Sequence, residues 1–201
     1  MNAQVVPGSS SRADAQRDRI LCAALKCFIE HGFHAASMAS IADTAQMSAG
    51  LMYRYFENKN AIVLGIIERQ LEEKRAIIRQ LHSSSDFATG LLAAFERWCT
   101  ADPGVMNPAL FLEMSVEATR NPLLAEALRS FDAGMRMELQ AWLGRDRELG
   151  GMGLAPECAA TRALSLQCFI DGLVLRSVRE PNVDRDQLRS TVQEQIDRLT
   201  R

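Results

Sequence analysis

The sequence predicts an all-α fold, and three observations support this prediction. Apolar residues recur at spacings of three and four along most of the chain, as they do on one face of an amphipathic helix. No segment alternates apolar and polar residues in the manner of a half-buried strand. Glycine, proline and asparagine gather in the breaks between the periodic segments. With 201 residues, 47% of them hydrophobic, the chain can bury a sizeable core. We therefore expect a small N-terminal helical domain followed by a larger one.

The first expected helix covers about residues 14–31. Residues 1–12, which precede it, contain a proline, a glycine and a run of three serines, a composition that favours a flexible arm. We expect the helix to end at Gly32, because glycine readily takes the left-handed conformation that often follows a helix.

Two short helices are expected next. Ser37 and Ser48 are suitable N-cap residues for them, and Gln46 lies in the tight turn between them. Asn58 is a suitable cap for a longer helix that ends at about residue 81. The remaining expected helices cover about residues 86–100, 107–119, 122–145, 156–179 and 184–200. The expected divisions are an arm at 1–12, a small helical domain at 13–57, a linking helix at 58–81 and a second helical domain at 82–201.

Composition and charge limit the possible classes of function. The net charge of −2 offers no overall basic surface for nucleic acid, so any contact with DNA must be local. Five cysteines without a CxxC spacing favour reduced thiols, which are typical of the cytosol. The sequence has no run of eighteen apolar residues, and its N-terminus lacks the apolar segment of a signal peptide. We therefore expect a cytoplasmic protein that does not enter a membrane.

The sequence shows none of the common catalytic motifs. The three histidines, His31, His34 and His82, do not fall in an HExxH spacing, and no GxSxG motif is present. His31 is better explained as a cation near the C-terminus of a helix. We expect no enzymatic activity, no cofactor and no metal site.

Residues 38–57 fit a helix-turn-helix. Ile41, Ala42, Ala45 and Met52 supply the apolar and small positions where the two helices of this motif meet. In this arrangement the second helix enters the DNA major groove with its N-terminus first. Ser48, Ala49 and Gly50 would then present small groups that permit close approach to the bases.

Polar residues that suit phosphate contacts follow in the same stretch. Both tyrosines of the chain, Tyr53 and Tyr55, lie there with Arg54 and Lys59. Phenol, guanidinium and ammonium groups donate to phosphate oxygens, and Arg54 could also read guanine with two hydrogen bonds. Tyr55 can instead pack the small domain, or do both with its hydroxyl outward. An accidental helical hairpin with both tyrosines as packing residues is the alternative reading of the whole motif.

The run GFHAASMASIADTAQMSAGLMYRYFENKNAIVLGII resembles the DNA-binding domain of the TetR family of transcriptional regulators, over roughly residues 14–67. The resemblance implies an all-α homodimer with a variable C-terminal ligand domain, and repression relieved by a small molecule. Matching positions imply DNA contacts in two groups: phosphate contacts by Ser37, Ser48, Tyr53, Tyr55 and Lys59, and base proximity for Ala49, Gly50 and Arg54. Gln46 departs from the glycine usual at the turn, at a cost of roughly 1 kcal/mol if the backbone is left-handed.

The C-terminal helices hold the candidate ligand pocket. The large apolar candidates are Phe95, Trp98, Met106, Phe111, Met114, Met135 and Phe169, each of which could equally be a core residue. Glu113 and Glu117 share one helical face and are either a solvated edge or paired acids that would favour a cationic ligand.

The last two helices hold the candidate dimer interface, as the resemblance implies. Their apolar candidates are Leu166, Ile170, Leu173, Val174, Leu188, Val192 and Ile196, and packing within one subunit is the alternative for them. The sequence as a whole predicts a dimeric regulator that binds a pseudo-palindromic DNA operator and is released by a small hydrophobic or cationic ligand. The alternative is a helical ligand-binding or interaction module without specific DNA binding.

Overall fold

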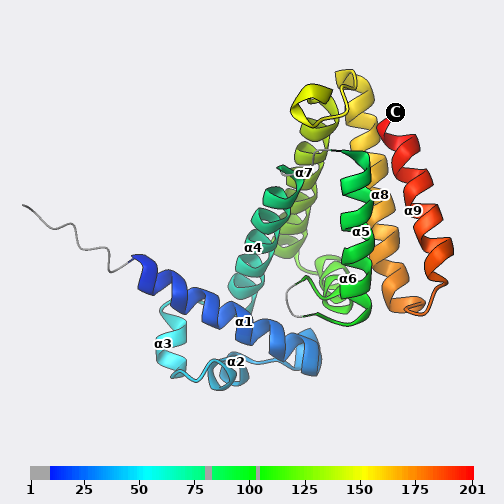
Figure 1. Ribbon diagram of the computed structural model, residues 1–201. Coiled ribbons are helices and arrows are strands. Elements are labelled where there is room, and N and C mark those ends of the chain that lie inside the picture. The colour runs from blue at the N-terminus through cyan, green and yellow to red at the C-terminus, as the bar shows by residue number, and fades with distance from the viewer. Residues whose placement is uncertain (1–9, 80–82, 103–104) are drawn as a thin grey trace, which may run out of the picture. The chain divides into compact units, whose positions relative to one another are not determined.

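The computed structural model describes residues 10–79, 83–102 and 105–201. These residues contain helices and no strand, so the all-α prediction is confirmed (Figure 1). The helices are α1 (Ser10–Ala35), α2 (Met38–Thr44), α3 (Ala49–Tyr53), α4 (Lys59–Arg79), α5 (Ser84–Cys99), α6 (Pro108–Ala118), α7 (Pro122–Gly144), the 3-10 helix η1 (Arg147–Leu149), α8 (Pro156–Arg179) and α9 (Arg185–Thr200). The chain divides into two compact units, Met1–Ile66 and Ile67–Arg201, and the division falls inside α4.

The first helix differs from its prediction at its start. It begins at Ser10, so residues 10–12 of the predicted arm are helical, while residues 1–9 lie outside the described part. Gly32 has φ 78° and ψ 159°, a backbone that side chains rarely adopt, and it kinks the helix. The first helical segment ends at this residue, as expected, and a second short segment continues to Ala35. Phe33 packs against Phe28 with ring centroids 5.4 Å apart.

The expected turn between α2 and α3 is present. Ser37 and Ser48 are the N-caps, and the Ser48 hydroxyl accepts from the Leu51 amide at 3.2 Å. Gln46 has φ 51°, so the left-handed backbone is retained despite its side chain. Arg19 Nη2 on α1 donates to the Gln46 carbonyl at 3.1 Å and so ties the turn to the first helix.

The N-terminal unit has its own core under the two short helices. Its largest fully buried side chains include those of Ile20, Phe28, Ile41, Met52 and Ile62. Gly65 on α4 allows the closest approach, because a Cβ there would lie 3.1 Å from Leu21 Cδ2 and 3.2 Å from Phe56 Cε1. The apolar positions of the predicted motif therefore hold α2 and α3 on α1 and α4.

The helix starts of the C-terminal unit follow its caps and prolines. Asn107 and Asn121 accept with their side chains from the amides of Leu110 and Leu124, at 3.1 and 3.3 Å, and a proline follows each of them. Asp184 caps α9 by accepting from the Gln187 amide at 2.7 Å. The five predicted helices of this unit are confirmed to within a few residues at each end.

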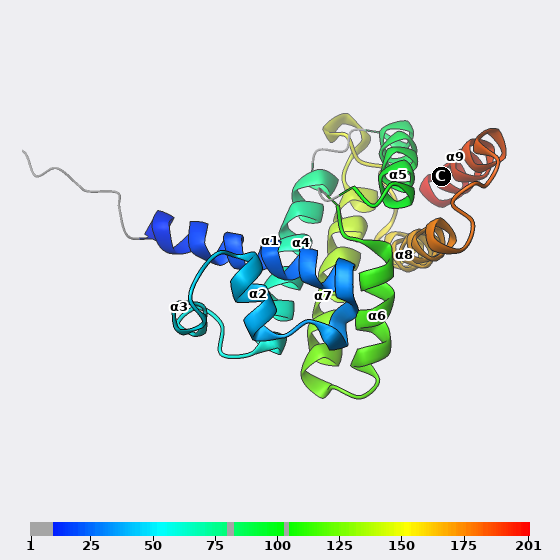
Figure 2. The same ribbon diagram turned by 90° about the horizontal axis from the view of Figure 1, so that it is seen from below.

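Helix α8 is the central helix of the C-terminal unit. It packs against α5, α6, α7 and α9, and Figures 1 and 2 show α5, α8 and α9 side by side and α6 beside α7. Among the described helices, α8 alone is long and apolar enough to cross a membrane by length and composition. Its residues Ala163 and Leu166 are fully buried in the core of this unit, which is the environment of a core helix.

The C-terminal half of α4 is fixed to α7 by ion pairs. Glu138 on α7 accepts a hydrogen bond from Arg79 Nη2 at 3.3 Å, and its Oε1 forms an ion pair with Arg75 Nε at 3.6 Å. Glu72 pairs with the same two arginines at 3.8 and 3.6 Å. Because four charges form one network, this contact is stronger than an isolated surface pair.

Candidate functional site

The start of α3 presents a small, open surface. Ser48, Ala49 and Gly50 are all exposed. A Cβ added at Gly50 would meet no atom within 4 Å, so this glycine is not required by packing within the chain. The surface is therefore free to approach a flat or grooved partner closely.

Polar side chains flank this surface at the end of α3. Tyr53 is 53% exposed and Arg54 is exposed, so both can reach an external partner. Tyr55 is half-buried, and its carbonyl accepts from Arg17 Nη1 at 3.3 Å. Tyr55 therefore sits between the two roles that the sequence allows, packing and phosphate contact.

Lys59 makes contacts that the sequence did not predict. Its Nζ donates to the carbonyls of Phe33, His34 and Ala36 at 2.7, 3.4 and 3.1 Å. A lysine ammonium has three donor hydrogens, so these carbonyls match its full capacity. Lys59 thus caps the end of α1, and a phosphate contact would require it to exchange one of these partners.

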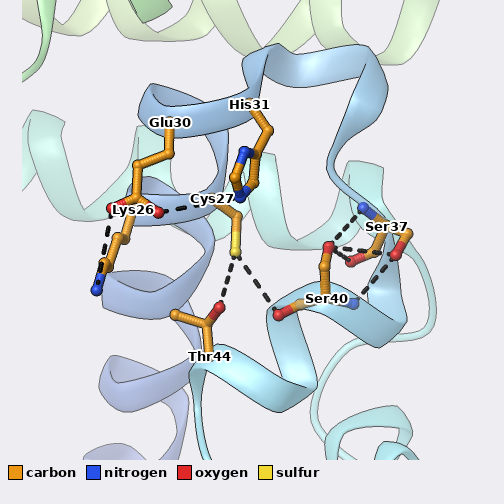
Figure 3. Close-up of polar contacts among 7 residues, drawn as sticks. All are labelled: Lys26, Cys27, Glu30, His31, Ser37, Ser40 and Thr44. Carbon is orange, nitrogen blue, oxygen red and sulfur yellow. Dashed lines mark hydrogen bonds and ion pairs between the residues drawn. The ribbon is translucent and has the colours of Figure 1, made fainter.

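The start of α2 is held against α1 (Figure 3). Ser37 and Ser40 form a reciprocal capping box, with Ser40 N donating to Ser37 Oγ at 3.0 Å and Ser37 N donating to Ser40 Oγ at 2.9 Å. The buried Cys27 thiol on α1 donates to the Ser40 carbonyl at 3.7 Å and lies 3.2 Å from Thr44 Oγ1. Ser37 is exposed, but its hydroxyl already serves the cap.

Two arginines of α1 support the motif from outside it. Arg19 holds the turn, and Arg17 holds the end of α3, where its guanidinium also lies 4.5 Å from the centroid of the buried Phe56 ring. The two hydrogen bonds join residues 27 and 38 positions apart. No local sequence pattern could have indicated such distant partners.

The C-terminal unit contains a cavity of about 270 Å³. Its wall is almost entirely apolar and comes from α4, α5, α6, α7, α8 and the residues just before α6. Of the residues predicted for a pocket, four line it: Trp98, Met106, Phe111 and Met135. Phe95 and Met114 are buried elsewhere, and Phe169 is half-buried beside the core. Glu113 is exposed, Glu117 is half-exposed, and neither contributes to the wall.

Five polar side chains interrupt the apolar wall: Lys74, Arg97, Asp132, Gln167 and Asp171. Arg97 is paired with an aspartate outside the wall, Asp102, at 2.9 Å. Burial lowers the pKa of Lys74, because a desolvated ammonium loses its proton more readily.

The two aspartates have raised pKa values. Burial raises the pKa of Asp132, against the opposing effects of Arg136 and a hydrogen bond from Gln167. Burial, and then the charge of Asp132, raise the pKa of Asp171 to about 6. Both carboxylates line the same cavity, Asp132 from α7 and Asp171 from α8.

The residues predicted for a dimer interface lie inside the unit. Leu166, Leu173, Leu188, Val192 and Ile196 are all buried in its core. The other two, Ile170 and Val174, line the cavity. These seven side chains are therefore packed within a single copy of the chain.

Comparisons with known proteins agree with this division of the chain. The sequence model of bacterial regulatory proteins of the tetR family matches residues 20–66, and that of the BetI-type transcriptional repressor C-terminal domain matches residues 88–201. The transcriptional regulator UidR of Escherichia coli is 32% identical over 120 residues, 60% of each chain. The transcriptional activator FasR of Mycolicibacterium smegmatis is 33% identical over 90 residues, 44% of this chain and 41% of FasR.

A solved structure matches over nearly the whole length. GusR of Salmonella enterica superposes with a TM-score of 0.74 at 26% identity, covering 92% of this chain and 95% of that one. The match joins a helix-turn-helix unit to a helical unit of the same architecture. The chain therefore belongs to the TetR family of transcriptional regulators.

Proposed function

We propose that this regulator is a repressor that binds a pseudo-palindromic operator as a dimer and leaves it when a small hydrophobic or cationic molecule fills the cavity. The observation that carries the proposal is the apolar cavity of the C-terminal unit. Lys74 and Ile78 of α4 line it, and the same helix begins in the DNA-binding unit at Lys59. A ligand that favours one position of α4 would shift the equilibrium between DNA-binding and released states.

The proposed DNA contacts follow from the exposed surface of α3. Ala49 and Gly50 would approach the bases, Arg54 would read guanine, and Ser48 and Tyr53 would contact phosphates. Ser37, Tyr55 and Lys59 are proposed as phosphate contacts nearer the edge of this surface, Lys59 by exchange of a carbonyl partner. Because the net charge is −2, the affinity must come from these local groups.

The proposed dimer supplies two such surfaces. Two recognition helices one helical turn of DNA apart, about 34–36 Å, would read the two half-sites. Leu164 and Val178 on α8 are 46% and 43% exposed, and such large apolar side chains favour burial against a second copy. The core residues predicted for this interface would pack beneath these exposed side chains and hold α8 and α9 in place.

Repression is supported by the description of the matched C-terminal domain, which names a repressor. FasR is named an activator, and in general the direction of control depends on where the operator lies relative to the promoter. One observation supports the alternative, a helical ligand-binding module without specific DNA binding. The Lys59 ammonium donates to three backbone carbonyls of its own chain, and a phosphate contact would have to displace one of them.

The test is fluorescence anisotropy of the full chain with DNA duplexes that tile the region upstream of its own gene, in a salt series. We expect selective binding with a slope of log affinity against log salt of about −0.9 for each phosphate contact. Tyr53→Phe with Arg54→Ala should abolish binding while leaving thermal stability unchanged. If neither the tiles nor unrelated DNA bind at low salt, the DNA-free module becomes the better description.

A further inference from the structure

We propose that the cavity of the C-terminal unit takes a small organic amine, with its ammonium group against Asp132 and Asp171 and its apolar body between α5, α6 and α7. This inference rests on the proposed function only in treating the cavity as the effector site. It adds the chemical class of the ligand, which the apolar wall alone does not specify.

The charge of the wall favours a cation. Asp132 and Asp171 line the cavity from two different helices, and the charge of Asp132 adds to the raised pKa of Asp171. Among the described residues, no basic side chain forms an ion pair with either carboxylate; Arg136 donates instead to Gln167 Oε1 at 3.0 Å. An ammonium between the two carboxylates would relieve their repulsion and replace the part of their solvation that the protein removes.

The basic groups of the same wall leave this preference in place. Arg97 already pairs with Asp102 outside the wall. Lys74 comes from α4, and burial, rather than the charge of either aspartate, is the main cause of its lowered pKa. A carboxylate ligand would have Lys74 as its one unpaired basic partner among the described wall residues, against two acids that repel it.

The volume limits the apolar body. A cavity of about 270 Å³ holds roughly nine groups of the size of a water molecule, at about 30 Å³ each. A straight primary amine with eight carbons has this size. Trp98 lines the cavity, and Phe87, another wall residue, stacks on the fully buried Trp142 with ring centroids 5.0 Å apart. Both tryptophans therefore report on its occupation.

The experiment is a titration of the full chain at pH 7.5, without DNA, followed by tryptophan fluorescence. The probes are octylammonium, 1-octanol and octanoate, which share one chain length and differ in the charge of the head group. We expect octylammonium to bind at least tenfold more tightly than 1-octanol, as a charge-assisted contact implies, and octanoate to bind most weakly.

Asp171→Asn tests the assignment directly. It should reduce the ratio of octylammonium to 1-octanol affinity below threefold. The matched control is Asp186→Asn on α9, which removes an exposed carboxylate paired with Arg189 and should keep the full ratio. A thermal melt of each variant confirms that it is folded.

Three results would overturn the inference: equal affinity for octylammonium and 1-octanol, tightest binding of octanoate, or no binding of any probe. Failure here is separate from failure of the regulator proposal, because the titration contains no DNA. A protein that prefers octylammonium but never binds an operator would contradict only the regulator proposal.

Discussion

Lys59 and Phe33 are joined twice, since the Lys59 Nζ donates to the Phe33 carbonyl at 2.7 Å and lies 4.4 Å from the centroid of the Phe33 ring. This contact fixes the start of α4 to the end of α1. A cation at the C-terminal end of a helix also compensates the partial negative charge of its carbonyls. Lys59 is therefore part of the structure of the DNA-binding unit before any DNA is present.

We expect Lys59→Met to destabilise the protein by about 1.5–3 kcal/mol, because the partly buried carbonyls lose a charged donor. Urea unfolding of the full chain measures this. Lys26→Met is the control, since Lys26 is exposed and only pairs with Glu30 at 3.9 Å; it should change stability by less than about 0.5 kcal/mol. Equal stability of the two variants would remove the structural role of Lys59.

Gly50→Ala should separate stability from DNA binding. The added methyl meets open space in the free protein and improves helix propensity, so we expect a gain of about 0.5–1 kcal/mol. The same methyl would obstruct close approach to DNA and lower the affinity about tenfold, or roughly 1.4 kcal/mol. Thermal melts and anisotropy measure the two effects. Gly90→Ala on α5, which also meets nothing within 4 Å, should leave DNA affinity unchanged.

Gln46→Gly should stabilise the turn by up to about 1 kcal/mol, since glycine removes the cost of the left-handed backbone and loses part of that gain to its own chain entropy. The Arg19 contact to the carbonyl at this position does not depend on the side chain. Gln46→Ala keeps the Cβ and should bring no gain in urea unfolding. A gain from alanine equal to that from glycine would show that the backbone is not strained.

The raised pKa of Asp171 predicts the direction in which the stability of the protein changes with pH. The pKa of Asp171 is raised to about 6 in the folded protein, against about 3.9 for an unfolded aspartate. Between these two pKa values the folded state binds more protons at this group than the unfolded state does. The contribution of Asp171 to the free energy of unfolding therefore falls as the pH rises.

Asp171→Asn should therefore stabilise the protein more at pH 7.5 than at pH 4. Asp171 keeps substantial solvent exposure, which limits the gain to about 1 kcal/mol or less. The measurement is the difference in melting temperature between variant and parent at each pH, in which the titration of other carboxylates cancels. If the variant gains more in melting temperature at pH 4 than at pH 7.5, the pKa of Asp171 is not raised in the folded protein.

The helix boundaries were predictable because their causes are local. Ser48, Asn107 and Asn121 cap helices within three residues of their own positions, so the sequence shows both partners of each contact. Gly32 was also recognisable as a break, but the short helical segment that follows it, up to Ala35, was not predicted. Periodicity alone does not contain that information.

The chemistry of the cavity was not predictable in the same way. The sequence suggested Glu113 and Glu117 as an acid pair because they share one face of one helix. The acids that meet at the cavity, Asp132 and Asp171, come from two helices. Helical spacing shows which residues share a face, but it does not show which faces of two helices meet.

The division of α4 also matters for anyone who wishes to build hybrid regulators. Before Ile66 the helix contacts its own unit, as in the packing of Gly65 on Phe56. After Ile66, Arg79 pairs with Glu138 of the second unit. A hybrid whose crossover lies at either end of α4 would therefore separate one of these pairs of contacting residues. A crossover between residues 66 and 67, in the middle of a continuous helix, would transplant a DNA-reading unit with both sets of partners intact.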